Sequence, residues 1–441
     1  MIGKLKTLLT KNSGFARYLK NTSWLMGEKV VRLLIALSVG VWVTRYLGPE
    51  QFGILSYAQS FVGIFAALSS LGLNDIIIRE LVKDQDRRNL ILGSSFGLQT
   101  LGSSLIMLIL IISIYYNDNE PLTNKIIIIL GLLTFINSFN VIASYFHSQV
   151  KSKFYAIAGL VGVIISALLK IYLILGSYSL IYFVYVLTFD VIFLVTGLIW
   201  FYKKSGESLL KWKFSWKMAK DLLKDAWPLI LSGIIVSIYM KIDQVMIKEY
   251  LGNGEVGQYS AAVRLSEAWY FIPTIICSSL FPAIINAKLK DDTLYKDRLQ
   301  RLYNLMVVLG VVIILPVLKL SDWMINLLYG EAFQRSAGVL NIHILGSVFV
   351  FLGVANQKWF ISENYQAYNI ICLGMGMVAN IVLNVIMIPK MGIMGAAYAT
   401  LISQFTASVL APVFFKKTRS SFYMMLRALF FVQVFKDGKI V

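Results

Sequence analysis

The sequence predicts an all-α integral membrane protein with about twelve transmembrane helices. Of its 441 residues, 58% are hydrophobic and only 15% are charged, whereas soluble domains carry about 25% charged residues. Apolar runs of about 20 residues, the length that crosses a bilayer as a helix, recur along the chain. These runs are continuous and not alternating, which favours helices over a closed barrel, the other structure that can pair every backbone group within lipid.

The apolar runs divide into two sets of six. The first set lies at 24–43, 53–78, 90–115, 126–146, 154–175 and 180–202, and the second at 226–247, 258–286, 302–320, 337–359, 367–388 and 393–415. A last apolar stretch at 422–435 is too short to span comfortably and contains Arg427 and Gln433. We therefore expect this stretch at the membrane interface.

Lysine and arginine are distributed unevenly over the predicted loops. If the N-terminus is cytoplasmic, the cytoplasmic segments contain 29 of these residues and the opposite side contains six. Because positively charged loops stay in the cytoplasm, both termini are predicted to be cytoplasmic. The same distribution explains most of the net charge of +18, so no nucleic-acid partner is expected.

Residues suited to catalysis or to a metal centre are few. Both cysteines lie in apolar runs and predict no disulfide, and His147 and His343 are far apart without a nearby cysteine or acid. No phosphate-binding loop of the form GxxxxGK[ST] is present. The predicted outside segments at 116–125 and 321–336 carry no convergent acid–base set. We therefore expect a protein that is not an enzyme, with no metal site beyond the cation site described below.

The chain contains an internal repeat. Residues 46–58 (YLGPEQFGILSYA) and 250–262 (YLGNGEVGQYSAA) are identical at six of 13 positions. Each copy follows the first helix of its set, where Gly48 and Gly53 are predicted to allow a tight turn and Pro49 to begin the next helix. Because six helices separate the copies, both halves insert with the same orientation, which is the parallel kind of repeat.

The repeat predicts two six-helix lobes related by a pseudo-two-fold axis. The N-terminal lobe is expected at 1–202 and the C-terminal lobe at 226–415. A basic cytoplasmic linker at 203–225 joins them, and a cytoplasmic or interfacial tail follows at 416–441. Two six-helix bundles around a central cavity form a transporter architecture.

The segment TRYLGPEQFG at 44–53 resembles the signature of polysaccharide transporters of the O-antigen flippase type. Their superfamily also contains multidrug-and-toxin extruders and the lipid II flippase. Lys241-Ile242-Asp243 and residues 257–262 fit the same family, and the resemblance covers essentially the whole chain. It implies alternating access and an undecaprenyl-diphosphate-linked oligosaccharide as cargo, moved from the cytoplasmic to the outer leaflet for cell-surface polysaccharide synthesis. Membrane lipid, a polysaccharide polymerase and chain-length proteins are the candidate partners of an expected monomer.

Charged residues inside predicted spans are candidates for cargo binding, because they are costly in lipid and usually face a cavity or a partner. A diphosphate headgroup needs fixed cations, and arginine can hold phosphate oxygens in a bidentate manner. The predicted headgroup contacts are Arg32, Lys241 and Arg264, with Lys29 and Arg79 as cytoplasmic-side recruiters.

Two acids accompany these cations. Glu28 is four residues from Arg32, and Glu267 is three residues from Arg264, so each acid shares a helix face with its arginine. These acids are included in the predicted binding site. The alternative is that both pairs only neutralise each other, and that the two recruiting cations extend to lipid headgroups instead.

A second group of polar residues suits a small cation. The group combines one carboxylate, two amide oxygens and a hydroxyl, which are hard oxygen donors. Its members are Asp243, Asn380, Asn384 and Thr400. In the family resemblance they correspond to a sodium site between three helices of the second lobe, with a backbone carbonyl near Ala396. Unlike the family pattern, this chain has no second acid on the asparagine helix, and helix packing is the alternative role.

No other cofactor is predicted, and sodium ions or protons are the candidate coupling ions. A cation-coupled multidrug exporter of the same superfamily is the alternative function. Such an exporter would favour acidic cavity residues for organic cations, whereas this chain offers arginine and lysine.

Overall fold

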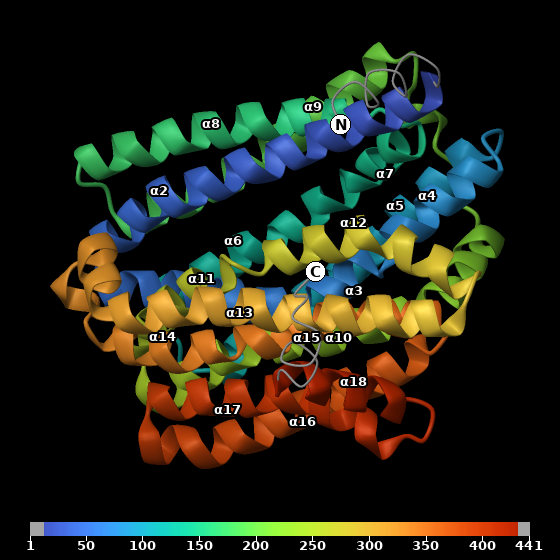
Figure 1. Cartoon of the computed structure of the whole chain (residues 1–441). Helices are drawn as coiled ribbons and strands as arrows, with labels where there is room; N and C mark the ends of the chain where they lie inside the picture. Colours follow the sequence, from blue (N-terminus) through green and yellow to red (C-terminus); the bar gives the residue numbers. More distant parts are fainter. Residues whose placement is uncertain (1–12, 431–441) are drawn as a thin grey trace. The chain divides into compact units, whose positions relative to one another are not determined.

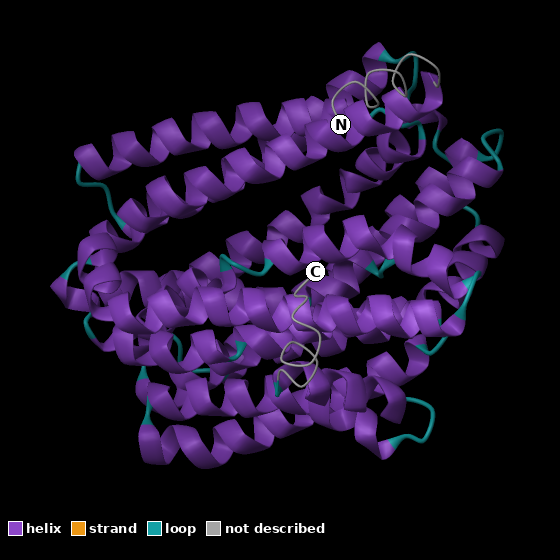
Figure 2. Ribbon diagram, in the orientation of Figure 1, coloured by secondary structure: helices purple, strands orange, loops and turns teal. Residues whose placement is uncertain are grey.

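The computed structural model describes residues 13–430, which form helices joined by short loops and contain no strand (Figure 2). Within these residues, eleven segments are long and apolar enough to span a membrane, and the first, Ser23–Lys83, has 61 residues. A helical path of that length is about 90 Å, roughly three times the thickness of the hydrocarbon core. It therefore suffices for two crossings, and the prediction of an all-α membrane protein with about twelve spans is confirmed.

Contacts divide the chain into two compact units. Of the described residues, unit 1 comprises 13–46 and Phe61–Ile234, and unit 2 comprises Leu47–Ser60 and 235–430. The helices α2 (Ser13–Ile64) and α10 (Trp216–Leu251) each contribute to both units. The lobes predicted at 1–202 and 226–415 derive from the repeat and not from contacts, and they stay a prediction.

Unit 1 contains the first part of α2 and a series of helices that follow it. These are α3 (Ala66–Ser70), α4 (Leu73–Lys83), α5 (Arg88–Tyr116), α6 (Pro121–Asn137), η1 (Ser138–Asn140), α7 (Val141–Ser148), α8 (Lys153–Leu175), α9 (Leu180–Lys204) and η2 (Leu209–Lys211). Pro121 lies at the start of α6, where its fixed φ suits the first helical turn. Figure 1 shows α8 and α9 beside the first part of α2.

Unit 2 contains the remaining helices. These are α11 (Asn253–Glu267), α12 (Phe271–Lys288), α13 (Asp292–Tyr329), η3 (Glu331–Phe333), α14 (Arg335–Leu345), α15 (Ser347–Ser362), α16 (Gln366–Met391), α17 (Ile393–Phe405), the π-helical η4 (Thr406–Leu410), η5 (Ala411–Phe414) and α18 (Arg419–Leu429). Five spans predicted as single helices are each divided into shorter helical pieces, and these are 53–78, 126–146, 258–286, 337–359 and 393–415.

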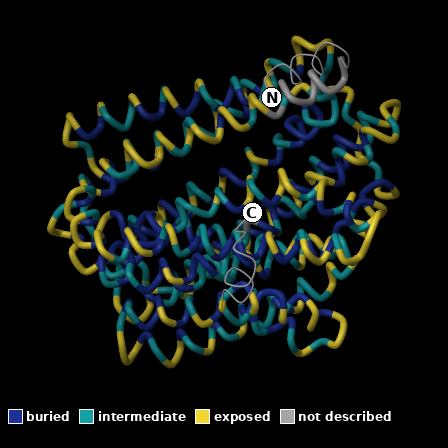
Figure 3. Tube along the Cα trace, in the orientation of Figure 1, coloured by how far each residue is buried: buried dark blue, intermediate teal, exposed yellow. Residues whose placement is uncertain are grey.

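Most helices have one buried and one exposed side, as the alternating colours of Figure 3 show. On α5 the exposed residues Leu101, Leu105, Leu108 and Ile112 recur at the spacing of one helix face. Ser94, Gln99 and Ser103 of the same helix are buried. Apolar residues outside and small or polar residues inside are the arrangement expected of a helix that faces lipid.

The two repeat copies share a backbone conformation. Gly48 has φ 68° and ψ 174°, and Gly252, at the same repeat position, has φ 89° and ψ 179°. A side chain is strained at such positive φ values, which glycine adopts freely. The predicted turn at Gly48 is confirmed, but the prediction is wrong for Gly53. Gly53 lies inside the helix that follows, where the lack of a side chain lets the backbone at Asn253 approach.

The end of α9 and the start of α10 differ from the predicted helix bounds. The helix α10 begins at Trp216, ten residues before the predicted start at 226. Its first three turns are rich in lysine and therefore lack a continuous apolar run. They are nevertheless helical, because Met218, Leu222 and Ala226 form one buried face packed into the core of unit 1.

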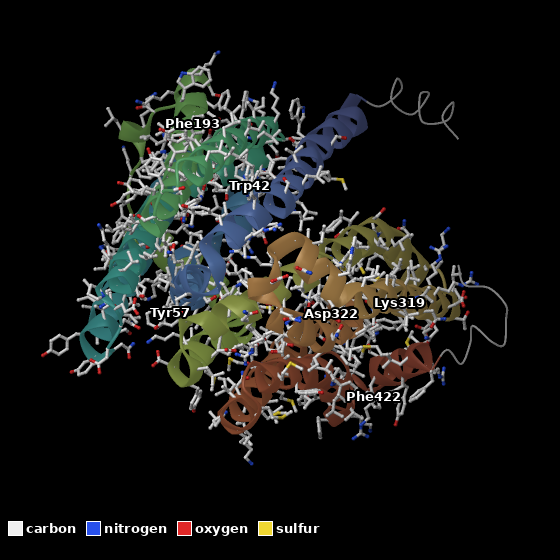
Figure 4. The ribbon with its side chains drawn as sticks, turned by 90° about the vertical axis from the view of Figure 1, so that its left-hand side faces the viewer. Trp42, Tyr57, Phe193, Lys319, Asp322 and Phe422 are labelled. Carbon is white, nitrogen blue, oxygen red and sulfur yellow. The ribbon has the colours of Figure 1, made fainter. Side chains whose placement is uncertain are left out.

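The helix α18 falls in the stretch predicted to be interfacial, of which residues 431–435 lie outside the described residues. Figure 4 labels Phe422 on this helix. Ser421 donates a hydrogen bond to Asn356 Oδ1 (2.6 Å) and lies 2.8 Å from the hydroxyl of Tyr303. Gln300 Nε2 donates to the carbonyl of Met424 (2.9 Å), so one side of α18 is attached to α13 and α15.

Candidate functional site

The buried carboxylate of Asp243 is the centre of a hydrogen-bond network in unit 2. The hydroxyl of Tyr259 donates to Asp243 Oδ2 (2.7 Å), and Thr400 Oγ1 donates to the same oxygen. Asn384 Nδ2 donates to Asp243 Oδ1 (2.6 Å) and to Asn380 Oδ1 (3.1 Å). The structure therefore brings together all four residues of the predicted cation group, from helices α10, α16 and α17.

The composition of this network fits a small cation. Thr400 Oγ1 also lies 3.0 Å from the carbonyl of Ala396, which adds a backbone oxygen to the group. Asn384 Oδ1 and Asn380 Nδ2 are buried and have no hydrogen-bond partner within residues 13–430. The oxygen and nitrogen of an amide are interchangeable by a half-turn. Such a turn of Asn384 would direct its side-chain oxygen at Asp243 Oδ1 and Asn380 Oδ1. Three oxygens facing one another are unfavourable unless a cation lies among them.

A second buried network lies beside the first. Gln244 follows Asp243 in α10, and its Oε1 accepts hydrogen bonds from Ser60 Oγ (2.7 Å) and Ser260 Oγ (3.0 Å). Ser260 belongs to the second repeat copy, and Ser60 follows the first. The two networks together fix α10 against α11 and against the segment Leu47–Ser60.

Arg264 of α11 is an exposed cation between buried neighbours. Val263 and Leu265 are buried, whereas the Arg264 side chain is exposed. Its guanidinium carbon lies 4.5 Å from the ring centroid of Phe52, a cation–π contact. No ion pair with Glu267 or any other acid forms within 4.0 Å in the described part of the chain. The arginine is therefore available to an external anion, and the alternative of a neutralised Arg264–Glu267 pair does not describe this structure.

Lys241 and Glu267 occupy intermediate positions in unit 2. Each is partly exposed, and among the described residues neither forms an ion pair within 4.0 Å. Lys241 lies two residues before Asp243, so the two side chains leave α10 in different directions. The structure places Lys241, Arg264 and Glu267 on two consecutive helices.

In unit 1, Glu28 and Arg32 form an ion pair. Arg32 Nη2 and Nε both lie 2.7 Å from Glu28 Oε1, and the acid is buried. The pair packs against Gly159 of α8, where a methyl group would lie 3.1 Å from Arg32 Nη2 and 3.2 Å from Glu28 Oε1. Arg32 is thus already neutralised, which is the alternative that the sequence left open for this pair.

The two predicted recruiting cations differ from each other. Lys29 is exposed. Arg79 is paired with two acids, Glu80 (2.8 Å) and Asp225 at the start of α10. Arg79 therefore fixes the start of α10 to α4, in addition to any role in binding.

Tyr259 and Phe52 are site residues that sequence reasoning missed. Tyr259 is fully buried and binds the Asp243 carboxylate, and Phe52 contacts Arg264. Both lie within the two repeat copies, at 250–262 and 46–58. Their place in the repeat could have identified them, because a repeated segment next to charged spans is a candidate part of the site.

Two solved structures share the fold of this chain. The chain superposes on "Lipid II flippase MurJ, inward closed conformation" with a TM-score of 0.69 and 16% identity, covering 95% of this chain and 93% of that one. It superposes on an inward-facing multidrug resistance MATE family transporter of the MOP superfamily with a TM-score of 0.70 and 18% identity, covering 90% and 96%. The fold is that of MOP-superfamily membrane transporters.

The sequence comparisons specify the family. The model of the family described as "Polysaccharide biosynthesis protein" matches residues 18–288, and the chain belongs to this family. The "Putative O-antigen transporter" of Shigella flexneri is 22% identical over 401 residues, which cover 86% of this chain and 93% of that protein. The resemblance found in residues 44–53 is thereby confirmed.

Proposed function

We propose that the chain is a flippase that moves an undecaprenyl-diphosphate-linked oligosaccharide from the cytoplasmic to the outer leaflet. Membership of the polysaccharide biosynthesis family supports this proposal, as does the similarity to a protein named for O-antigen transport. The cargo combines an anionic diphosphate, a polar glycan and a long apolar chain. A protein that moves it must offer cations to the diphosphate while the prenyl chain stays in lipid.

The observation that carries the proposal is the unpaired, exposed guanidinium of Arg264 within a spanning segment. An arginine inside a membrane is unfavourable by about 3 kcal/mol or more unless it faces water or a partner. Arginine stays protonated in proteins, so Arg264 cannot lower this free-energy cost by losing its proton. A cation held in that position is suited to bind the diphosphate, and Lys241, on the preceding helix of the same unit, is the second cation of the proposed site.

Alternating access is the mechanism by which such a site would serve both leaflets. The site would open first to one side of the membrane and then to the other, as proposed for transporters built from repeats. Glu267 does not pair with Arg264 in the conformation seen here, but it lies three residues away on the same helix face and would pair with it in a closed conformation without cargo. If the diphosphate replaced Glu267 as the partner of Arg264, and Glu267 replaced the diphosphate on release, the arginine would have an anionic partner whenever it is excluded from water.

The Asp243 group is the proposed site of a coupling cation, with sodium as the first candidate and a proton as the second. A bound sodium ion would neutralise the buried carboxylate. Asp243, Asn380, Asn384 and Thr400 would then turn from hydrogen-bonding one another to facing the ion. Such a change would alter how α10, α16 and α17 pack, which is how a cation could bias one conformation over the other.

The proposal includes the setting of the protein. The chain would act as a monomer in the bacterial cytoplasmic membrane with both termini in the cytoplasm, without catalysing a chemical reaction. A polysaccharide polymerase and chain-length proteins would use the product on the outer side. A multidrug exporter of the same fold is less well supported, because the matched family is that of polysaccharide biosynthesis and the relative from Shigella flexneri is named for O-antigen transport.

Complementation of a host that lacks its own flippase tests the proposal. Arg32, Lys241 and Arg264 are replaced singly by Ala and by Glu, and surface polysaccharide and membrane insertion are measured. Arg264→Glu is expected to insert normally, to abolish surface polymer and to leave lipid-linked units on the cytoplasmic side. Lys319→Glu is the matched control, since this exposed lysine of α13, labelled in Figure 4, forms no ion pair within the described residues. Unimpaired export by all three charge reversals would refute an anionic cargo.

A further inference from the structure

The segment 209–227, which leads from η2 into α10, is held in place on unit 1. The backbone N–H of Ser215 donates to Ser94 Oγ (3.1 Å), and that of Lys213 donates to the carbonyl of Asn89 (3.1 Å). Trp212 Nε1 donates to the hydroxyl of Tyr202 (3.1 Å). The segment therefore presents a defined surface and not a mobile loop. We call it the basic–aromatic segment.

The helical part of this segment has two distinct faces. Its inner face is made of Met218, Ala219, Leu222 and Ala226, all buried in the core of unit 1. The positions 216, 220, 223 and 227 follow the spacing of a single helix face and lie to one side of the inner face. They are occupied by tryptophan at both ends, with lysine and leucine between them.

Large apolar side chains on the outer surface of the segment are unusually exposed. Trp216 is 73% exposed, Trp227 is 61% exposed, and Leu210 is 97% exposed. Phe214 lies beside Trp216 with their ring centroids 5.0 Å apart. Apolar surface of this kind is unfavourable in water and marks a site of contact.

The apolar residues are surrounded by positive charge. The segment carries five lysines, at positions 211, 213, 217, 220 and 224, and all five are exposed. None of them forms an ion pair within 4.0 Å in the part of the chain that the structure describes. The segment has two acids, of which Asp225 is paired with Arg79 and Asp221 lies within one turn of Lys217 and Lys224. With five lysines and two acids, the segment keeps an excess of positive charge.

The length of α10 places this surface near the edge of a bilayer. The helix has 36 residues and is about 54 Å long, whereas the hydrocarbon core is about 30 Å thick. We assign the excess length to the first turns, because they carry Lys217, Lys220 and Lys224 whereas residues 226–240 carry no charge. Tryptophan is enriched in the headgroup region because its ring is apolar and its N–H is polar, and lysine pairs with anionic headgroups there.

We propose that the basic–aromatic segment is a membrane-surface site that binds the phosphate headgroups of anionic phospholipids through its lysines while Trp216 and Trp227 insert beside the acyl chains. The site is separate from the cargo site and does not depend on the proposed flippase function. Its consequence is that the start of α10 is attached to the membrane surface as well as to α4.

Quenching of tryptophan fluorescence by brominated lipids tests the proposal on the full chain in liposomes. The contribution of the two residues is isolated as the difference between wild type and Trp216→Phe or Trp227→Phe. Dibrominated phosphatidylglycerol is expected to quench this contribution more than dibrominated phosphatidylcholine, and high salt is expected to remove the difference. A lysine at an anionic surface contributes about fivefold to partitioning, so replacing all five lysines by Gln should remove the preference.

A matched variant controls for net charge. It replaces five other exposed lysines by Gln and is expected to retain the lipid preference; these are Lys125, Lys151, Lys290, Lys319 and Lys390. Equal quenching by both lipids in wild type would overturn the proposal. So would a Trp216 signal that neither lipid quenches and that aqueous iodide also fails to reach, because a protein partner would then cover this surface. Competition by undecaprenyl diphosphate at lower concentration than phosphatidylglycerol would also overturn it, in favour of a cargo-recruitment site.

Discussion

Gly53 and Gly257 occupy the same position in the two repeat copies and lie at the crossing of α2 and α11 in unit 2. A methyl group on Gly257 would lie 2.9 Å from the α-carbon of Pro49, and one on Gly53 would lie 3.0 Å from the backbone nitrogen of Gly257. Each repeat copy therefore leaves room for the backbone of the other. The repeated motif has a packing role in addition to forming a turn.

Replacing either of these glycines by Ala is expected to destabilise the protein by about 1–3 kcal/mol, because a methyl group must displace backbone. Thermal unfolding in detergent measures the effect. Gly40→Ala is the control, since a methyl group there meets nothing within 4 Å and alanine is the better helix former. Unchanged thermal stability of both Gly53→Ala and Gly257→Ala would show that this crossing is not tightly packed.

The Asp243 group is expected to give the protein a sodium-dependent stability. A ligand at 100 times its dissociation constant stabilises the folded state by about 2.7 kcal/mol. Sodium should therefore raise the melting temperature of wild type, and potassium at equal ionic strength should raise it less. Asp243→Asn and Asn384→Ala should abolish the difference, because each removes an oxygen donor. A sodium effect that survives in Asp243→Asn would place the ion elsewhere.

The ion pair between Arg79 and Asp225 allows a test of whether Arg79 recruits cargo or only stabilises the packing of α4 against α10. Both side chains are largely exposed, so the pair is expected to contribute less than about 1 kcal/mol to stability. If Arg79 recruits cargo, Arg79→Ala should reduce export, whereas Asp225→Ala should leave export intact, because it removes one of the two acids paired with Arg79 and keeps the arginine. Equal losses of export in both variants, with no further loss in the double variant, would assign Arg79 a structural role only.

Ser421 is expected to be the main attachment of α18. Its hydroxyl is buried and contacts Asn356 and Tyr303, so Ser421→Ala would remove two buried hydrogen bonds and leave only the one from Tyr303 to Asn356 Oδ1. We expect a loss of about 1–3 kcal/mol in unfolding free energy. Ser420→Ala, one residue earlier on the exposed side, should have almost no effect. Proteolysis of the C-terminal segment measures whether α18 detaches before the rest of the protein unfolds.

The membrane class and the spans could be predicted from the sequence because both follow from apolar run length. The helical start of α10 could not, since its buried face of Met218, Leu222 and Ala226 is interrupted by lysines at every turn. The break at Gly346 is also invisible to hydropathy, because apolar residues lie on both sides of it.

Four of the five members of the Asp243 hydrogen-bond network could be predicted from the sequence, but the geometry of the network could not. Asp243, Asn380, Asn384 and Thr400 were recognisable as polar residues in apolar helices, yet Tyr259 was not, because a tyrosine in a span is usually interfacial. For Arg32 and Arg264, the sequence spacing alone could not decide whether the arginine pairs with the nearby acid or stays free to bind an anion. Glu28 pairs with Arg32, whereas Glu267 does not pair with Arg264, although both acids are within one turn of their arginine.

Translocation by the purified chain in liposomes tests the central claim most directly. Undecaprenyl-diphosphate-linked oligosaccharide is incorporated into both leaflets, and a membrane-impermeant glycosidase reports the fraction accessible from outside. With wild type, nearly all of the glycan is expected to become accessible over time, whereas Arg264→Glu should leave accessibility at the level of protein-free liposomes and Lys319→Glu should match wild type. Accessibility that never exceeds the protein-free level with wild type, or that rises equally with Arg264→Glu, would contradict the account.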